Sequence, residues 1–339
     1  MNPRRAWFSA SALAIALLVV AVVTATVLEP HTRNFARFQA AGVWKIDFHV
    51  QSDPEVLGYA VNWAASQGIL GMVLLDAGTV GGGLEQRLEA AARFPGRVLV
   101  FMTLDGRGCC GPEWADRETA RLVQGRAAGA RGLHVPERLG APGEAPVPLD
   151  HPGLSPIWEA ARGLELPVAV HAGSGPDSRA AMARAVERNP AIPFVALQMA
   201  GLGGDPGELS RLLDRLPNLL VGTAGAIPEM ARHPEAMREL LVARSDRFLL
   251  GTDLTWMQGP RPELRALVIG SGPPVRSTEQ VLRYFDTTWR FYETLETAIP
   301  GPVAGDPPVS GLGLPREALE RLYRGNARRL LGFGDLEAR

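Results

Sequence analysis

The sequence predicts a (β/α)8 TIM barrel, an α/β fold, preceded by an N-terminal transmembrane or signal helix. Eight short apolar runs alternate with amphipathic segments from Val43 onward, and eight is the number of strands in such a barrel. The runs are apolar throughout rather than alternating, as in parallel strands that are buried on both faces. No GxGxxG motif follows the first run, which disfavours a doubly wound dinucleotide-binding sheet.

The N-terminal residues are predicted to lie outside the barrel. Arg4 and Arg5 precede an apolar run at 10–28, close to the roughly 20 residues that cross a bilayer as a helix. These arginines, with Glu29 after the run, favour a cytoplasmic N-terminus and an extracytoplasmic body, membrane-anchored or secreted. A retained anchor and a cleaved signal peptide both fit this pattern. The predicted organisation is a cytoplasmic segment at 1–9, the anchor or signal peptide at 10–28, a linker at 29–42, the barrel with its C-terminal helix at 43–332, and a tail at 333–339.

The strands are predicted from short apolar runs that are bounded by glycine, proline or polar residues. In chain order they are expected at 43–49, 69–76, 98–104, 131–135, 166–171, 193–198, 218–222 and 247–253.

The helices are predicted from apolar residues at helical spacing, as in Val56, Tyr59, Ala60 and Trp63. They are expected at 54–67, 84–93, 113–128, 156–163, 178–188, 206–216, 228–244 and 278–294. An insertion rich in Gly, Pro and Arg is expected at 254–277, after the eighth strand. A last helix is expected from Pro315 to about Leu331, since proline suits the first turn of a helix.

Composition excludes several classes of function. The net charge is -1, with 35 basic and 36 acidic residues, which gives no electrostatic case for binding nucleic acid. Lys45 is the only lysine, so any Schiff-base or carbamylated lysine would have to be that residue. Cys109 and Cys110 are adjacent, which is neither a disulfide framework nor a zinc-ligand spacing. A vicinal disulfide and two free loop cysteines both remain open.

Titratable residues collect where predicted strands end. Barrel enzymes place their chemistry at the carboxyl ends of the strands. The first strand ends in Asp47-Phe48-His49, the fifth in His171 and the eighth in Asp253. Strand alternation is expected to place Asp47 and His49 on one face, toward the inside. Imidazole nitrogen and carboxylate oxygen are the usual non-sulfur ligands of zinc. The sequence therefore predicts a divalent metal site, with zinc as the first expectation, held by His49, His171 and Asp253. Asp253 is alternatively a base that orients water.

Four motifs occur in order along the chain. They are IDFH ending at His49, PVAVHAG containing His171, FLLGTD ending at Asp253, and GNARRLLG ending at Gly332. With these motifs the sequence from Val43 to Gly332 resembles the amidohydrolase superfamily. The specific group is the amidohydrolase-related one that includes aminocarboxymuconate semialdehyde decarboxylase-like proteins. The resemblance implies that His49 is the first-strand ligand, His171 the fifth-strand ligand and Asp253 the eighth-strand carboxylate.

The sequence departs from this family at two positions. The family motif Asp-x-His-x-His has Gln51 in place of its second histidine, and Gln198 replaces the histidine that ends the sixth strand. A glutamine amide is a weak zinc ligand and cannot shuttle protons near neutral pH. His134, on the fourth strand, is a substitute ligand, a base or a packing residue. Gln51, His134, Gln198 and Trp256 are expected to face the substrate.

These observations predict a metal-dependent hydrolase that acts on a small carboxylate, lactone or amide, or a related non-oxidative decarboxylase. The metal would polarise the substrate or generate hydroxide, and Asp253 would orient or deprotonate the water. The alternative, motivated by the two glutamines, is a catalytically degenerate membrane-associated barrel that binds a ligand or partner without turnover. The expected partners are a small-molecule substrate and, if the N-terminal helix is uncleaved, the membrane.

Overall fold

A computed structural model describes residues 42–339, except 141–144, 174, 259–264, 271, 273, 276, 335 and 337–339. Residues Val43–Arg339 form one compact unit. The predicted membrane or signal helix at 10–28 lies outside the described residues. Within the described part of the chain, no helix is both long enough and apolar enough to cross a membrane.

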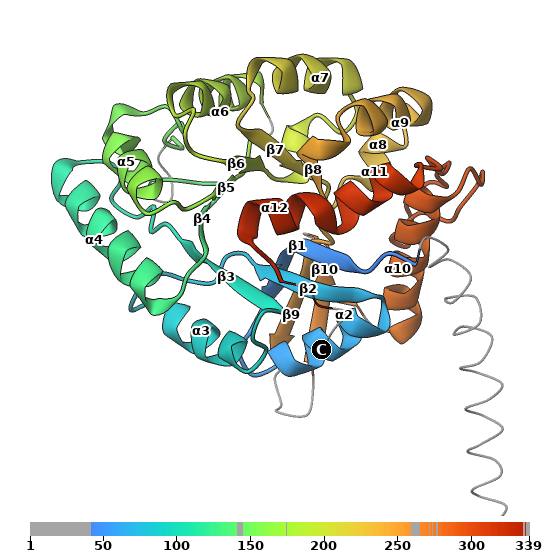
Figure 1. The fold of residues 1–339 in the computed structure, drawn as a ribbon, viewed down its shortest axis with the longest axis horizontal. Coiled ribbons are helices and arrows are strands. Elements are labelled where there is room, and N and C mark those ends of the chain that lie inside the picture. Colours follow the sequence, from blue (N-terminus) through green and yellow to red (C-terminus); the bar gives the residue numbers. More distant parts are fainter. Residues whose placement is uncertain are drawn as a thin grey trace, which may run out of the picture. The chain divides into compact units, whose positions relative to one another are not determined.

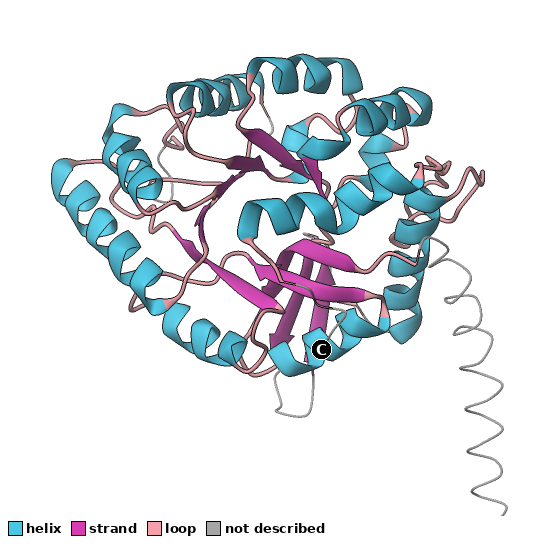
Figure 2. Cartoon of the chain, in the orientation of Figure 1, coloured by secondary structure: helices cyan, strands magenta, loops and turns pink. Residues whose placement is uncertain are grey.

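The body is a curled sheet surrounded by helices (Figures 1 and 2). All eight predicted strands are present, and neighbours from β1 to β8 pair in parallel, as in a (β/α)8 barrel. Their bounds are β1 Lys45–Ser52, β2 Ile69–Leu74, β3 Val98–Thr103, β4 Gly132–Val135, β5 Val168–Val170, β6 Phe194–Ala196, β7 Leu219–Gly222 and β8 Phe248–Leu249.

Helices follow the strands on the outside of the sheet (Figure 2). The α-helices are α2 Leu57–Ser66, α3 Leu84–Ala92, α4 Pro112–Ala128, α5 Ser155–Gly163, α6 Pro176–Arg188, α7 Pro206–Arg215, α8 Ile227–Met230, α9 Pro234–Ala243, α10 Thr278–Glu293, α11 Arg316–Glu320 and α12 Asn326–Leu331. Short 3-10 turns lie at η1 Pro152–Leu154, η2 Gln198–Gly201 and η3 Ser245–Arg247, and η4 Arg321–Gly325 is a π-helical turn. The predicted helix at 228–244 is instead two helices, because Pro234 cannot continue a helix from the preceding turn.

The eighth strand is shorter than predicted, and residues outside it close the barrel. β8 ends at Leu249, and the next residue, Leu250, donates its N–H to the carbonyl oxygen of Leu322 in η4 at 3.1 Å. Phe48 N donates to Leu250 O at 2.8 Å, and Asp253 N donates to His49 O at 3.0 Å. These bonds join the β8 segment to β1 on one side and to the C-terminal helices on the other.

The insertion after the eighth strand is a β-hairpin, which the sequence did not predict. β9 Leu254–Gln258 pairs in parallel with the end of β1, and β10 Arg265–Ile269 pairs antiparallel with β9. The hairpin therefore extends the barrel wall beside β1, past the carboxyl ends of the other strands.

The apolar core lies inside the barrel, below the carboxyl ends of the strands. Ile46 and Phe48 of β1 pack there with Phe101 of β3, and the rings of Phe48 and Phe101 meet edge to face at 5.5 Å. Phe333 and Leu336 are also buried in this core, so residues that were predicted as a tail are part of the packed body.

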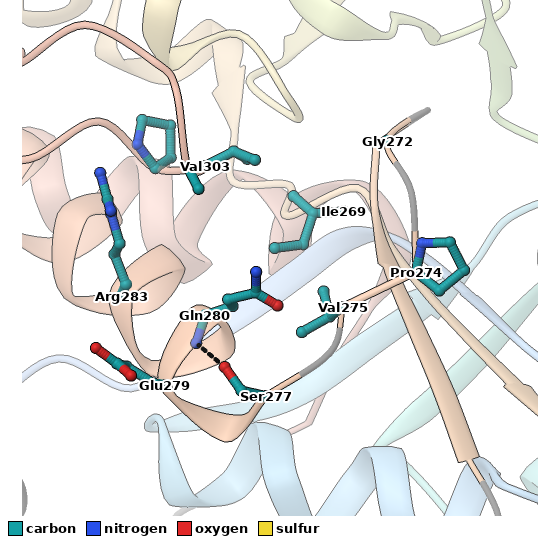
Figure 3. Close-up of a pocket in the computed structure, with 11 residues that line it drawn as sticks. Ile269, Gly272, Pro274, Val275, Ser277, Glu279, Gln280, Arg283 and Val303 are labelled. Carbon is teal, nitrogen blue, oxygen red and sulfur yellow. Dashed lines mark hydrogen bonds between the residues drawn. The ribbon is translucent and has the colours of Figure 1, made fainter.

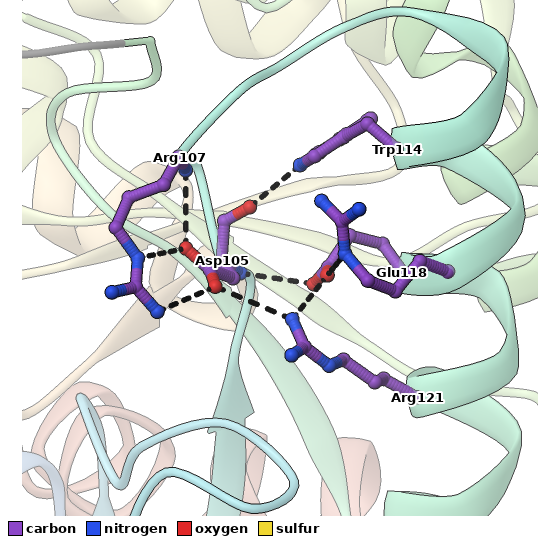
Figure 4. Close-up of polar contacts among 6 residues, drawn as sticks. Asp105, Arg107, Trp114, Glu118 and Arg121 are labelled. Carbon is purple, nitrogen blue, oxygen red and sulfur yellow. Dashed lines mark hydrogen bonds and ion pairs between the residues drawn. The ribbon is translucent and has the colours of Figure 1, made fainter.

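The loop after β3 is fixed to α4 by a cluster of charged side chains (Figure 4). Glu118 is buried, and its Oε2 accepts a hydrogen bond from Asp105 N at 3.1 Å. Arg121 Nη1 contacts Glu118 Oε1 at 2.5 Å and Asp105 Oδ2 at 3.3 Å. Hydrogen bonds from Arg107 are the largest cause that lowers the pKa of Asp105, to about 2.

Candidate active site at the carboxyl ends of the strands

His49 reaches the mouth of the barrel because β1 is irregular. The register of β1 against β2 shifts between Asp47 and Val50, which marks a β-bulge. His49 Nε2 lies 3.2 Å from Asp253 Oδ1, whereas Asp47 turns to Thr252. The expectation that Asp47 and His49 share an inward face is therefore wrong, because the bulge resets the alternation of side chains.

Asp47 forms a buried support beneath the site. Its carboxylate accepts hydrogen bonds from His49 N and Thr252 N, each at 3.0 Å, and from Thr252 Oγ1. The hydroxyl of Tyr284, on α10, donates to Thr252 O. Burial raises the pKa of Asp47 to about 7, against the opposing effect of these hydrogen bonds. This arrangement fixes the backbone on both sides of the His49–Asp253 contact, and the sequence analysis identified neither Thr252 nor Tyr284.

His134 of β4 and His171, which follows β5, meet directly. His134 Nε2 lies 3.4 Å from His171 Nε2, and the His134 Nδ1 atom accepts a hydrogen bond from Asp76 N at 3.2 Å. His134 is buried and His171 is half-buried. The rings of His49 and His171 are 6.4 Å apart between centroids. The residues predicted on the first, fourth, fifth and eighth strands are thus brought together.

Gln198 contacts the carboxylate of Asp253. Its Nε2 donates to Asp253 Oδ2 at 3.1 Å. Its side chain also raises the pKa of the His171 imidazole, against the larger effect of burial, which lowers it. Contacts therefore run from Asp76 N–H through His134 to His171, and from Gln198 through Asp253 to His49.

Backbone strain collects at the same place. Among the described residues other than glycine, positive φ angles occur at seven positions, and five of them lie just after β2, β6 and β8: Asp76, Gln198, Met199, Ala200 and Asp253. Each costs on the order of 1 kcal/mol and persists only where the surrounding structure enforces it. Such clustering is typical of functional sites. Asp76 was missed in the sequence, although it ends a predicted strand at the same edge as His49 and Asp253.

Two predicted substrate-facing residues stand apart from the network. Gln51 Oε1 accepts a hydrogen bond from Thr255 Oγ1 at 3.3 Å, which places Thr255 on the same face of the sheet as Gln51. Trp256 is buried and packs edge to face on Tyr59 of α2, with ring centroids 5.6 Å apart. Because neighbouring strand residues face opposite ways, Trp256 points to the helix layer, and its expected place at the mouth is corrected.

Burial governs the electrostatics of the site. It is the largest cause lowering the pKa of His49, to about 4, and it also lowers the pKa of His134 and of His171. Burial therefore favours the uncharged form of all three imidazoles. For His171 the opposing effects include three carboxylates, those of Glu137, Asp253 and Asp76. Glu137 and Asp76 are exposed to solvent, so the mouth around His171 is acidic.

The donor set does not fit the predicted zinc ion. Within the described ranges, no group of three or more His, Cys, Asp or Glu side chains could hold a metal ion. His171 Nε2 faces His134 Nε2, and the Asp253 oxygens contact His49 and Gln198. An imidazole must offer an unprotonated nitrogen to a metal, so the contact between His134 and His171 would have to break before either Nε2 atom could bind one.

A separate cavity of about 550 Å³ lies between β10, the start of α10 and the loop at 302–304 (Figure 3). Its polar lining includes Ser277, Gln280 and Arg283, and Arg283 Nε donates to Gly301 O at 2.9 Å. None of the predicted site residues lines this cavity.

Comparisons with known proteins agree with the fold. A family model described as amidohydrolase matches residues 59–333. An uncharacterized TIM-barrel protein from Bordetella bronchiseptica superposes with a TM-score of 0.58 at 15% identity, covering 88% of this chain and 100% of that one. A 2,6-dihydroxybenzoate decarboxylase from Rhizobium superposes with a TM-score of 0.52 at 15% identity, covering 86% of this chain and 99% of that one. A dihydroxybenzoic acid decarboxylase from Polaromonas sp. superposes with a TM-score of 0.53 at 15% identity, covering 86% of this chain and 97% of that one. That structure holds manganese and the inhibitor 2-nitroresorcinol. No curated protein matches the chain in sequence.

Proposed function

Because the chain belongs to the amidohydrolase family, we propose that it is a hydrolase that acts on a small amide or lactone at the mouth of the barrel. The observation that carries this proposal is the cluster at the carboxyl ends of four strands, in which His49 and Gln198 both contact Asp253 and the His171 ring lies 6.4 Å from the His49 ring. These side chains come from distant parts of the chain and are held by a strained backbone, which is typical of a catalytic site.

Asp253 is the proposed general base. His49 and Gln198 each contact one of its two oxygens, and each carboxylate oxygen keeps a second lone pair that can accept a hydrogen bond from water. Asp253 would accept a proton as the water oxygen adds to the carbonyl carbon. It would return that proton to the leaving nitrogen or oxygen as the carbon–nitrogen or carbon–oxygen bond breaks.

The charge of the mouth supports an uncharged substrate. Asp76, Glu137 and Asp253 act together on His171, and like charges repel by about 1 kcal/mol at 4 Å even in water. An anionic substrate would meet this repulsion, whereas an amide or a lactone would not. Of the predicted substrate classes, the amide and the lactone are therefore favoured over the carboxylate, and hydrolysis over decarboxylation.

The test measures turnover by the purified full-length protein. The substrates share one acyl group, which is presented as an amide, as a lactone or as the free acid. Hydrolysis of the amide or the lactone is expected, and it should fall about 100-fold or more in Asp253→Asn. The exposed Asp116→Asn is the matched control and should keep full activity. Release of carbon dioxide from the free acid would establish the decarboxylase instead. Activity unchanged in both His49→Ala and Asp253→Asn would reject the site.

A further inference from the structure

The cavity between β10 and α10 combines apolar walls with one cationic group (Figure 3). Ile269, Val275 and Val303 line it from three segments of the chain. Arg283, on α10, is the one cation among the lining residues that the structure describes. Its volume of about 550 Å³ lies within the range of about 300–1,000 Å³ that is typical of small-molecule sites. Size and lining therefore suit a small ligand with an apolar body and a charged end.

The Arg283 guanidinium is held through one nitrogen and keeps the other two for a ligand. Its Nε donates to Gly301 O at 2.9 Å, which fixes the orientation of the planar group. In the part of the chain that the structure describes, neither Nη atom has a hydrogen-bond acceptor or an ion-pair partner. Glu279, one turn earlier on α10, also lines the cavity but forms no ion pair with Arg283.

The charges of the lining favour a ligand with a single negative charge. Two parallel N–H groups of a guanidinium match the two oxygens of a carboxylate. Glu279 offsets the charge of Arg283, so the described lining residues carry no net charge. A doubly charged phosphate would face one carboxylate for its one cation, whereas a monocarboxylate needs only the guanidinium. A monocarboxylate with an apolar body therefore fits the cavity better than a phosphate ester.

The β10 wall of the cavity continues directly to the proposed general base. Ile269 lines the cavity, and the next residue, Gly270, donates its N–H to Asp253 O at 2.9 Å. A Cβ atom at position 270 would lie 3.4 Å from Asp253 Oδ2, so the Gly270 backbone also packs against the carboxylate. A ligand that packs on Ile269 would therefore restrain the residue that touches Asp253.

The α10 wall leads to the same segment. Arg283 lines the cavity, and its neighbour Tyr284 donates its hydroxyl to the carbonyl oxygen of Thr252, the residue before Asp253. Each wall is thus one residue away from a hydrogen bond to the backbone of Thr252 or Asp253. A ligand that contacts both walls would hold this backbone from two directions in the sequence.

We propose that this cavity is an effector site for a monocarboxylate with an apolar body, and that an occupied cavity stabilises the backbone of Thr252 and Asp253. The carboxylate would pair with the two Nη atoms of Arg283, and the apolar body would lie against Ile269 and Val303. Binding here does not depend on the proposed function, and its tests need no substrate. Failure to find a substrate and failure of this proposal are therefore separate results.

The first test measures binding to the purified full-length protein by isothermal titration calorimetry. The probes are phenylacetate, hexanoate and octanoate, and each is compared with the uncharged alcohol of the same carbon skeleton. At least one carboxylate should bind about tenfold or more tightly than its alcohol, because only the carboxylate pairs with the guanidinium. Equal affinities for every pair, or no binding of any carboxylate at millimolar concentration, would overturn the proposal.

The second test locates the bound carboxylate. Arg283→Met should weaken its binding about tenfold or more, whereas Arg162→Met, at an exposed position on α5, should leave it unchanged. Arg283→Met also removes the bond to Gly301 O, so Val303→Trp is a second variant that keeps the guanidinium and fills the cavity. It should weaken binding of the carboxylate as well. Unchanged affinity in either cavity variant would overturn the proposal.

The third test detects the effect on Asp253. Hydrogen exchange of the Gly270 N–H, which bonds to Asp253 O, is followed by mass spectrometry with and without the carboxylate. If this bond opens only after the ligand leaves, exchange should slow about tenfold at a ligand concentration about ten times the dissociation constant. Peptides from α5 should exchange at the same rate in both samples. Unchanged exchange at Gly270 would refute the effector role.

Discussion

Gln198 Nε2 and Asp253 Oδ2 lie 3.1 Å apart, and both residues have left-handed backbone conformations. Neither is a glycine, so each conformation costs on the order of 1 kcal/mol. The contact therefore depends on a turn after β6 and a turn after β8 that are both held by their surroundings, and residues remote from the reacting atoms should affect the site.

The acidity of the mouth should control substrate choice. Asp76→Asn combined with Glu137→Gln removes two of the three carboxylates that act on His171. We expect kcat/KM for an anionic substrate analogue to rise about tenfold, because about 1 kcal/mol of repulsion is removed. The value for the matched uncharged amide should change little. An equal change for both substrates, measured at low ionic strength, would contradict this account.

The support beneath the site should contribute to stability. Thr252→Val keeps the shape of the side chain but removes its hydrogen bond to the buried Asp47 carboxylate. We expect the free energy of unfolding to fall by about 1–3 kcal/mol in urea denaturation. Thr119→Val is the matched control, since Thr119 Oγ1 is buried and has no hydrogen-bond partner among the described residues. This control should leave the free energy of unfolding unchanged or raise it. A loss of stability equal to that of Thr252→Val would argue against a stabilising role for the hydrogen bond between Thr252 and Asp47.

Lys45 should give the protein a distinctive pH dependence. Its Nζ is buried 4.5 Å from the centre of the Trp289 ring, and burial lowers its pKa to about 8 from 10.5. Between these values the unfolded chain binds more protons than the folded one, so stability rises with pH from 8 to 10.5. The rise amounts to about 3 kcal/mol for a shift of this size.

The measurement for Lys45 is urea denaturation of the natural protein and of Lys45→Met across that pH range. The free energy of unfolding of the natural protein, relative to that of Lys45→Met, should rise by about 3 kcal/mol across this range. Other titrating groups affect both proteins equally and drop out of the difference. Parallel curves would show that Lys45 titrates normally.

The ionic cluster behind β3 should be sensitive to the loss of one arginine (Figure 4). Arg121→Leu leaves the buried Glu118 carboxylate without its closest cation, which should cost about 3 kcal/mol of unfolding free energy. Arg117→Leu, whose guanidinium is half exposed and 3.6 Å from Glu118, should cost less than about 1 kcal/mol. Adding Glu118→Gln to Arg121→Leu should recover part of the loss, and no recovery would exclude the unpaired charge as its cause.

The barrel was predictable because each buried parallel strand is a continuous apolar run, and such runs are visible one strand at a time. For the same reason His49, His171 and Asp253 could be placed at strand ends, and the structure brings them together: His49 contacts Asp253, and the rings of His49 and His171 are 6.4 Å apart. The hairpin of β9 and β10 was not predictable, because β9 is defined by its pairing with β1 rather than by its own pattern.

Side-chain direction was the other limit. The β-bulge after Asp47 exists only in the register between β1 and β2, and it sends Asp47 and His49 to different environments. The role of Gln198 depends on three consecutive left-handed residues, two of them fully buried, and no local propensity predicts that conformation. The sequence shows Gln198 as a histidine that has been replaced, whereas the structure shows that its amide donates to Asp253 Oδ2.

The bond from Leu250 N to Leu322 O has a consequence for synthesis of the protein. Asn326 adds two more links, donating its side-chain nitrogen to Ser245 O and Phe248 O. Every strand of the barrel precedes these partners in the sequence. While the polypeptide is still emerging from the ribosome, the β8 segment can pair with β1 but lacks these three hydrogen bonds to the residues that follow it. This part of the barrel wall is therefore fixed on both sides only after translation has passed η4 and α12.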